Sequence, residues 1–243
     1  MTFVVRVSIA VVGGAAVAVA ALAGANQPQG FWLRHAFAFY AAVAAIGLSG
    51  VIHPLAEAVR DRVVQRALAR RYRVETMLRA AFVRIVDQGT IDFRQLGVGA
   101  YLVGREHWYS LRQVMVPVGR VRLTATPAFA AVRWTRGKGV IGVCWQRGMF
   151  AAADLTGLGA FALDALPAEW SALDAQARLG LTLQEARRTS MYKVVAAMPI
   201  VVDGRVQGCV AADGPQGTFA ALTSERVKVL LAETAQAVWL AST

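Results

Sequence analysis

The sequence predicts an α+β domain that follows an apolar N-terminal region. Residues 7–25 and 36–56 contain no Asp, Glu, Lys or Arg, whereas short β-rich runs and helical patterns alternate between residue 91 and the C-terminus. A mean hydropathy of +0.46 and an apolar content of 56% are both high for a wholly soluble protein. The 243 residues can therefore accommodate one domain of ordinary size and a membrane-associated segment.

The N-terminal region, residues 1–56, is predicted to form a transmembrane helical hairpin. Each apolar run, 7–25 and 36–56, is close to the roughly 20 residues that a spanning helix needs. Between them, the polar sequence NQPQG at 26–30 is typical of a tight turn. Two alternatives remain open. The first run could be a cleaved signal peptide, because the AGA at 23–25 resembles a cleavage site, and the second could be a buried core helix.

The charge distribution predicts the orientation of this hairpin. Six arginines lie between Arg60 and Arg73, against one acid, Asp61. By the positive-inside rule this flank is cytoplasmic. We therefore expect a protein of the inner (cytoplasmic) membrane with both termini and the soluble domain in the cytoplasm. Residues 7–56 and the Arg60–Arg73 flank would contact membrane lipid. The basic run can fix the orientation in the membrane and bind anionic lipid. We therefore expect no nucleic-acid partner despite a net charge of +11.

Residues 57–90 are predicted to form a basic amphipathic helix that connects the membrane segment to the soluble domain. Apolar residues such as Val59, Val63, Leu68 and Tyr72 recur at spacings of mostly three to five, with arginines between them. Gly89 is a typical C-terminal stop. The helix could either pack on the soluble domain or pair with its copy in a homodimer.

Residues 91–243 carry the α+β pattern of the soluble domain. The clearest element is a β-hairpin formed by residues 192–202 and 205–213. Asp203-Gly204 separates the two runs and favours a type I′ turn, which needs positive φ at both central residues. Further β-rich runs cover 96–104, 108–118 and 149–155, and helical patterns cover 167–178, 182–191 and 223–241. A sheet rich in hairpins is largely antiparallel.

Gly137, Gly139 and Gly142 have the G-x-G-x-x-G spacing of phosphate-binding loops. A dinucleotide site would also need a full crossover helix after the glycines and an acid about 20 residues further on, and neither follows here. Walker A and protein-kinase motifs are also missing from the sequence. The spacing therefore does not predict a nucleotide site.

The sequence offers little to bind a metal or to catalyse a reaction. Two cysteines, Cys144 and Cys209, and three scattered histidines form no ligand cluster. Both cysteines lie in apolar runs, so we expect free, buried thiols. The sequence has no G-x-S-x-G elbow and no interpretable pair of carboxylates, so we expect a protein without catalytic activity.

Three segments resemble the GAF domain family: RWTRGKGVIGVCWQRG at 133–148, YKVVAAMPIVVDGRVQGCVAADGP at 192–215, and the helix opened by LTSER at 222–226. The resemblance extends over residues 77–243. It implies a six-stranded antiparallel sheet flanked by helices, with a small-molecule pocket on one face. In such a fold Gly137, Gly139 and Gly142 would let a short helix pack closely on the sheet.

The resemblance leaves the ligand open, because GAF-like domains bind different molecules, and we identify no cofactor. The sequence lacks the residue set typical of members that bind cyclic GMP and the cysteine set typical of methionine sulfoxide reductases. Haem and bilin are not favoured either. Side-chain type and placement near the implied pocket suggest six ligand contacts, each of which could instead be a core or capping residue: Trp134, Trp145, Trp170, Arg187, Tyr192 and Asp213. Arg136 and Lys138 are candidate anion contacts.

These observations together predict a membrane-anchored, cytoplasmic GAF-like sensory or regulatory module. It would bind a small molecule or a protein partner, and a homodimer would suit the connecting helix. Two alternatives stay open. One is a nucleotide-responsive membrane effector that perturbs the bilayer, and the other is a ligand-free dimerisation scaffold.

Overall fold

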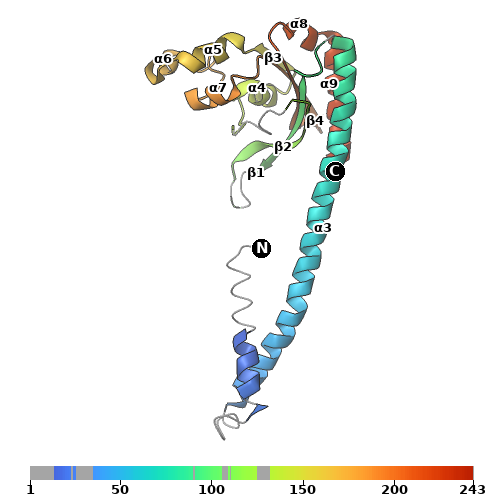
Figure 1. Ribbon diagram of the computed structural model, residues 1–243, viewed down its shortest axis with the longest axis vertical. Helices are drawn as coiled ribbons and strands as arrows, with labels where there is room; N and C mark the ends of the chain where they lie inside the picture. The colour runs from blue at the N-terminus through green and yellow to red at the C-terminus, as the bar shows by residue number, and fades with distance from the viewer. Residues whose placement is uncertain are drawn as a thin grey trace. The chain divides into compact units, whose positions relative to one another are not determined.

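The computed structural model describes residues 14–22, 24–25, 35–89, 91–105, 109, 111–124 and 132–242, with the backbone alone for 36, 38–39, 42–43 and 45–56. The chain divides into two compact units, residues 1–67 and 68–243. The first unit contains helical residues at 14–22 and the N-terminal part of a long helix, α3 (Figure 1). α3 runs without interruption over Ala36–Gly89, so the boundary between the units falls inside a helix.

The second unit holds a sheet and helices on both of its faces. After α3, its elements are β1 (Gly97–Arg105), β2 (Gln113–Arg122), α4 (Gly139–Arg147), β3 (Ala151–Asp154), α5 (Thr156–Asp164), α6 (Pro167–Ala172), α7 (Leu183–Thr189), β4 (Val194–Val202), β5 (Arg205–Gly214), α8 (Phe219–Leu222) and α9 (Glu225–Ser242). The sheet order is β2-β1-β5-β4-β3, and all neighbouring strands are antiparallel. This confirms the predicted α+β class and the antiparallel sheet.

The described sheet has five strands, and the expectation of six is wrong for this part of the chain. On the open edge of β2, Trp134 forms a single bridge with Met115. The chain then turns at residues 136–138 and enters α4 at Gly139. Among the described residues, pairing at this edge is limited to this one bridge, because the turn follows Trp134 so soon.

The β4–β5 hairpin is confirmed with its turn. Asp203 and Gly204 have φ values of 50° and 72°, as a type I′ turn requires. This turn matches the right-handed twist of the two strands that it joins.

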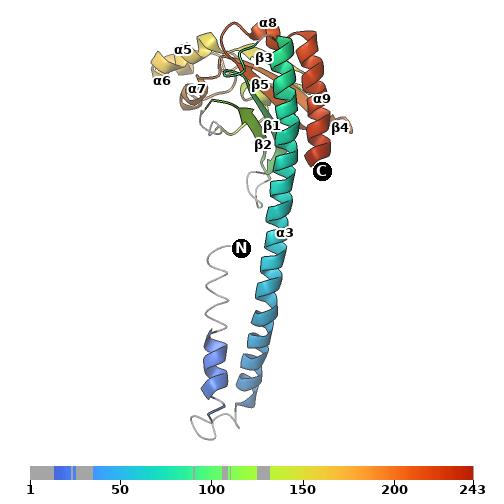
Figure 2. The ribbon, with the colours of Figure 1, turned by 45° about the vertical axis from the view of Figure 1, so that its right-hand side comes forward.

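One face of the sheet is covered by two helices that lie side by side, the C-terminal part of α3 and α9 (Figures 1 and 2). From residue 74 onward α3 has a buried stripe at helical spacing, which consists of Val74, Leu78, Ala81, Phe82 and Ile85. α9 offers a matching stripe of Val227, Leu230, Leu231, Ala235 and Val238. Alternate residues of β1, among them Val98 and Ala100, complete this core.

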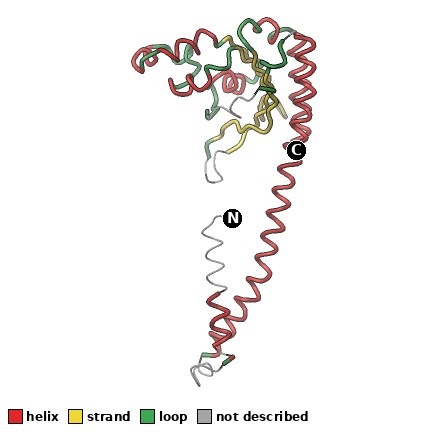
Figure 3. Tube along the Cα trace, in the orientation of Figure 1, coloured by secondary structure: helices red, strands yellow, loops and turns green. Residues whose placement is uncertain are grey.

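The opposite face of the sheet carries α4 and, beyond it, the helices α5, α6 and α7 (Figure 3). β1 presents Tyr101 and Val103 to this side, and β5 presents Cys209 and Ala211. α5–α7 pack around a smaller core of their own, which includes Trp170 and Leu181. The candidate site lies on this second face.

Among the described residues, no helix combines the length and the hydropathy needed to cross a bilayer. Much of the predicted hairpin lies outside the described residues, including 7–13 and the turn at 26–30, and most side chains of 36–56 are also not described. The transmembrane hairpin therefore stays a prediction from the sequence.

Candidate functional site

The second face of the sheet contains a cavity between the strands and the start of α4. The centre of a water-sized sphere can occupy about 70 Å³ within it. By this measure a water molecule needs roughly 10–15 Å³, so the space suits a compact small molecule. Its wall is formed by Gly99, Tyr101, Pro117, Arg120, Val132, Trp134, Gly139, Val140, Ile141, Leu155, Leu181, Thr189, Tyr192, Val195, Ala211 and Asp213.

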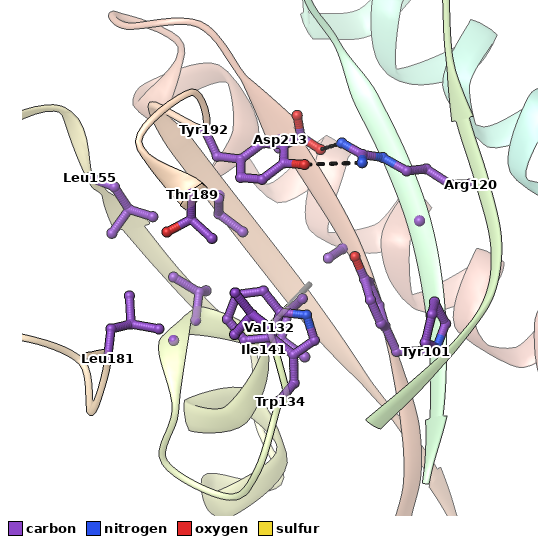
Figure 4. A pocket seen from close by; sticks show the side chains of 16 residues that line it. Tyr101, Arg120, Val132, Trp134, Ile141, Leu155, Leu181, Thr189, Tyr192 and Asp213 are labelled. Carbon is purple, nitrogen blue, oxygen red and sulfur yellow. Dashed lines mark hydrogen bonds and ion pairs between the residues drawn. The ribbon is translucent and has the colours of Figure 1, made fainter. Parts of the chain in front are cut away.

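One end of the cavity is polar and ionic (Figure 4). Arg120 on β2 donates a hydrogen bond from Nη1 to the Tyr192 hydroxyl at 3.0 Å. Its Nη2 lies 3.5 Å from Asp213 Oδ1. Arg122, two residues further along β2, contacts the other carboxylate oxygen of Asp213. These four side chains form what we call the arginine cluster: Arg120, Arg122, Tyr192 and Asp213.

The arginine cluster is shielded from solvent. The side chains of Arg120, Arg122 and Asp213 are 10%, 13% and 14% exposed, and Tyr192 is 9% exposed. The guanidinium carbons of the two arginines lie 5.2 and 5.7 Å from the Tyr192 ring centroid, within the range of cation–π attraction. Burial, together with the charge of Arg120, lowers the pKa of Arg122.

Two glycines on the central strand β1 make room for this cluster. Gly97 pairs with Arg122 on one side and with Asp213 on the other. A Cβ atom at position 97 would lie 2.5 Å from Asp213 Oδ1 and 2.8 Å from Arg122 Nε. Gly99 is the corresponding neighbour of Arg120. Because β1 has no side chains at these two positions, the arginines of β2 can reach across it toward β5.

The other end of the cavity is apolar. Figure 4 shows Val132, Trp134, Ile141, Leu155 and Leu181 around the space. Tyr101 lies along the sheet side. Burial raises the pKa of Tyr101 far above its usual range, so its hydroxyl stays neutral and can donate a hydrogen bond. A molecule that fills this cavity would meet one charged end and one hydrophobic end.

Three of the six candidate ligand residues line the cavity, namely Trp134, Tyr192 and Asp213. The other three do not line it. Trp145 is 3% exposed and lies in the core between α4 and the sheet. Trp170 packs within the α5–α7 core. Arg187 donates hydrogen bonds to the carbonyl oxygens of Ala162 and Ala165, at 2.8 and 2.9 Å, and so caps the end of α5.

The two candidate anion contacts have other partners. Lys138 Nζ lies 2.9 and 3.1 Å from the two carboxylate oxygens of Glu185, and this ion pair joins the start of α4 to the start of α7. Arg136 is exposed, and its guanidinium carbon lies 5.1 Å from the Trp145 ring centroid. Neither residue lines the cavity.

Arg120, Arg122 and Tyr101 belong to the site but were not predicted from the sequence. The predicted strand ended at residue 118, whereas β2 continues to Arg122. Had the strand been extended, two arginines at positions i and i+2 would have indicated a basic face. That alternation is the signal in the sequence that could have identified them.

The two cysteines lie outside the cavity and are buried and free, as the sequence predicts. Burial raises the pKa of Cys144 to about 12. The pKa of Cys209 is also raised, by burial and by its neighbour Cys144. Because the thiolate is the reactive form of cysteine, both side chains act as small apolar core residues at neutral pH.

Comparison with known proteins does not show which family this chain belongs to. No family model matches it, and no curated protein matches it. Solved structures with similarity include a type II free methionine-R-sulfoxide reductase from Thermoplasma acidophilum. It is 11% identical, has a TM-score of 0.40, and the alignment covers 71% of this chain and 94% of that protein.

Two further similar structures are described as GAF proteins. One is the GAF domain of an Acinetobacter phosphoenolpyruvate-protein phosphotransferase, with 14% identity, a TM-score of 0.37, and coverage of 74% of this chain and 90% of that domain. The other is a putative GAF sensor protein from Burkholderia vietnamiensis, with 19% identity, a TM-score of 0.36, and coverage of 74% and 94%. At TM-scores this low, these likenesses establish neither the family nor an activity.

Proposed function

We propose that the chain is a membrane-anchored, cytoplasm-facing regulatory module that binds a small molecule in the cavity of a GAF-like domain. The observation that carries the proposal is the cavity itself, which joins the buried arginine cluster to an apolar wall. Binding pockets of this kind are mostly apolar, with a few placed polar groups that fix the orientation of the ligand. The GAF assignment rests on the sequence motifs at 133–148 and 192–215.

We propose a binding role rather than catalysis. A GAF-like reductase would need reactive cysteines at its site, and here both cysteines are buried outside the cavity with raised pKa values. Tyr101 is held neutral, and Arg120 and Asp213 are paired with each other. The polar groups of the cavity are therefore suited to holding a ligand in place.

Ligand binding is expected to raise the thermal stability of the full-length chain purified in mild detergent. A ligand at 100 times its dissociation constant stabilises the fold by about 2.7 kcal/mol. The measurement is a thermal-shift screen with a panel of anionic, neutral and cationic metabolites, followed by native mass spectrometry of any hit.

Two matched variants connect a hit to the cavity. Leu155→Trp enlarges a partly buried wall residue and should abolish the shift. Leu240→Trp makes the same change at a side chain on α9 that is 73% exposed, and should leave the shift intact. A panel without any hit, or a hit that Leu155→Trp does not affect, would contradict binding in this cavity.

The membrane part of the proposal predicts a protein that fractionates with membranes and faces the cytoplasm. It is supported by the apolar runs at 7–25 and 36–56 and by the Arg60–Arg73 flank, all of whose described side chains are exposed. A reporter that is active only in the cytoplasm should be active when it is fused after Thr243. A reporter that is active only outside the cytoplasm should be active when it is inserted after Gly30. A C-terminal reporter active outside, or a chain that stays in solution without detergent, would refute the anchor and its orientation.

A further inference from the structure

Tyr101 on β1 presents to the cavity a hydroxyl group that lacks a hydrogen-bond partner. The residue lines the cavity, and within the described part of the chain its hydroxyl makes no hydrogen bond. Figure 4 shows this hydroxyl pointing toward the end of the cavity where Arg120 and Tyr192 lie. Burial raises the pKa of Tyr101 far above its usual range, although the charge of Arg120 opposes the rise. The hydroxyl therefore keeps its proton, and a buried O–H group needs an acceptor.

Tyr192 supplies a second hydroxyl proton at the same end of the cavity. Its oxygen accepts the hydrogen bond from Arg120 Nη1 at 3.0 Å, so its own proton is left to donate. No residue of the described ranges accepts that proton. The Tyr192 side chain is buried, which keeps bulk water away from it. The two hydroxyls come from different segments, β1 and the residues just before β4, and both are donors in need of an acceptor.

The charged groups of the cavity already face each other. Arg120 and Asp213 are the two residues with a formal charge in the wall of the described cavity, and Arg120 Nη2 lies 3.5 Å from Asp213 Oδ1. Arg120 also holds Tyr192. A charged ligand would have to compete for these groups in a site shielded from water, which is costly unless it replaces every partner that it displaces. The arrangement favours an uncharged ligand.

A carbonyl oxygen is the acceptor that suits these two hydroxyls. It has two lone pairs and can accept a hydrogen bond from each of them at once. The opposite end of the cavity is hydrocarbon and indole surface, from residues such as Val132, Trp134 and Ile141, and this surface favours an apolar group. Because the centre of a water-sized sphere has only about 70 Å³ available, the apolar group must be compact.

We propose that the cavity binds a small uncharged carbonyl compound, a ketone or an amide with a short hydrocarbon group. Its carbonyl oxygen accepts hydrogen bonds from the hydroxyls of Tyr101 and Tyr192, and its hydrocarbon part lies against Trp134 and Ile141. This inference rests on the proposed binding function and adds the chemical class of the ligand. Arg120 then acts as a positioning residue, because its bond to the Tyr192 oxygen leaves the Tyr192 proton for the ligand.

The first test is a calorimetric titration of the full-length chain in mild detergent with 2-pentanone and butyramide. Butyrate and butylamine serve as anionic and cationic compounds of similar size. Because each of these brings an additional charge to a site whose charges are already paired, we expect the better of the two carbonyl compounds to bind at least about tenfold more tightly than either. Equal or tighter binding of butyrate or butylamine would overturn the proposal.

Tyrosine variants test the two hydroxyls. Tyr101→Phe should weaken binding of the carbonyl compounds about fivefold, the usual effect of one neutral hydrogen bond. The empty domain should stay as stable as the parent chain, because the substitution removes no hydrogen bond. Tyr192→Phe should weaken binding similarly but also lower stability, since Arg120 loses a partner. Tyr72→Phe makes the same change at a side chain on α3 that is 69% exposed, and should affect neither binding nor stability.

Infrared difference spectroscopy separates a hydrogen bond to the ligand from a change in cavity shape. Hydrogen-bond donation to a carbonyl oxygen lowers its stretching frequency. The probe is 2-pentanone labelled with carbon-13 at the carbonyl carbon, bound to the parent chain and to Tyr101→Phe at saturating concentration. The labelled band should lie at higher frequency in the variant. A band at the same frequency in both proteins would show that Tyr101 does not contact the carbonyl oxygen and would overturn the proposal.

The outcomes distinguish this inference from the proposed function. If charged compounds bind more tightly than the ketone and the amide, and if Leu155→Trp blocks them, the ligand class is wrong and the binding function stands. If no compound of this panel or of the metabolite panel binds, both are wrong. If Tyr192→Phe does not fold, Tyr101→Phe still decides the matter, because unchanged affinity for the carbonyl compounds in that variant would overturn the role of the hydroxyls.

Discussion

Replacing Trp170 by alanine is expected to lower the free energy of unfolding by about 4 kcal/mol, within the range found for buried aromatic side chains. The side chain is 2% exposed and belongs to the small core of α5–α7. Its Nε1 donates a hydrogen bond to the Leu181 carbonyl oxygen at 3.2 Å, and its ring stacks on Phe161 with centroids 6.2 Å apart. Alanine removes all three contributions and leaves a cavity in a core with few other large side chains.

The measurement is urea-induced unfolding of the full-length chain in detergent, followed by pulse proteolysis. Trp170→Phe keeps most of the buried area and should cost far less. Phe93→Ala removes an aromatic side chain that is 46% exposed, so its effect should stay below about 1 kcal/mol. If Trp170→Ala weakened ligand binding without loss of stability, Trp170 would be the ligand contact that its residue type suggests.

Trp170 illustrates which parts of the site the sequence can predict. Six aromatic and charged residues within the GAF-like region, residues 77–243, are predicted as ligand contacts from their type and placement, and three of them line the cavity. Trp145 and Trp170 have the same chemistry but are buried in two different cores. Which core a tryptophan enters depends on contacts between elements far apart in the chain. Residue type alone cannot decide this.

Local features were predictable because their causes are local. The β4–β5 turn needs two residues with positive φ, and Asp203-Gly204 supplies them. The α9 stripe follows from helical periodicity. The arginine cluster is different, because Arg122 and Asp213 meet only when β2, β1 and β5 are paired in register across Gly97. The number of strands likewise depends on where pairing at the edge of β2 stops.

The glycine motif at 137–142 also takes its meaning from tertiary contacts. Gly137 and Gly139 have φ values of 77° and 60°, and the chain reverses there between Trp134 and α4. The Gly137 N–H donates to the Gly142 carbonyl oxygen at 2.8 Å, and the Gly142 N–H donates to the Lys138 carbonyl oxygen at 2.9 Å. These bonds fold the turn back onto the first turn of α4. The motif therefore shapes a wall of the cavity, which Gly139 lines.

Gly142→Ala is expected to destabilise the domain by about 3 kcal/mol, toward the upper end of the usual cost of overpacking. A Cβ atom at this position would overlap the Thr135 carbonyl oxygen and lie 3.3 Å from backbone atoms of Gly137. Backbone atoms cannot rotate away as a flexible side chain can, so the turn and α4 must separate. Because Gly139 and Ile141 line the cavity, this separation should also abolish ligand binding.

Gly157→Ala is the matched control for this substitution. Gly157 also lies near the start of a helix, α5, but it is exposed, and a Cβ atom there would meet nothing within 4 Å. Alanine is the better helix former, by up to about 1 kcal/mol, so this variant should be as stable as the parent chain or slightly more stable. Urea unfolding of both variants separates the effect of close packing from that of helix propensity. If the two alanines had equal effects, the backbone of residues 135–137 would not pack against α4, and the glycine spacing would need another explanation.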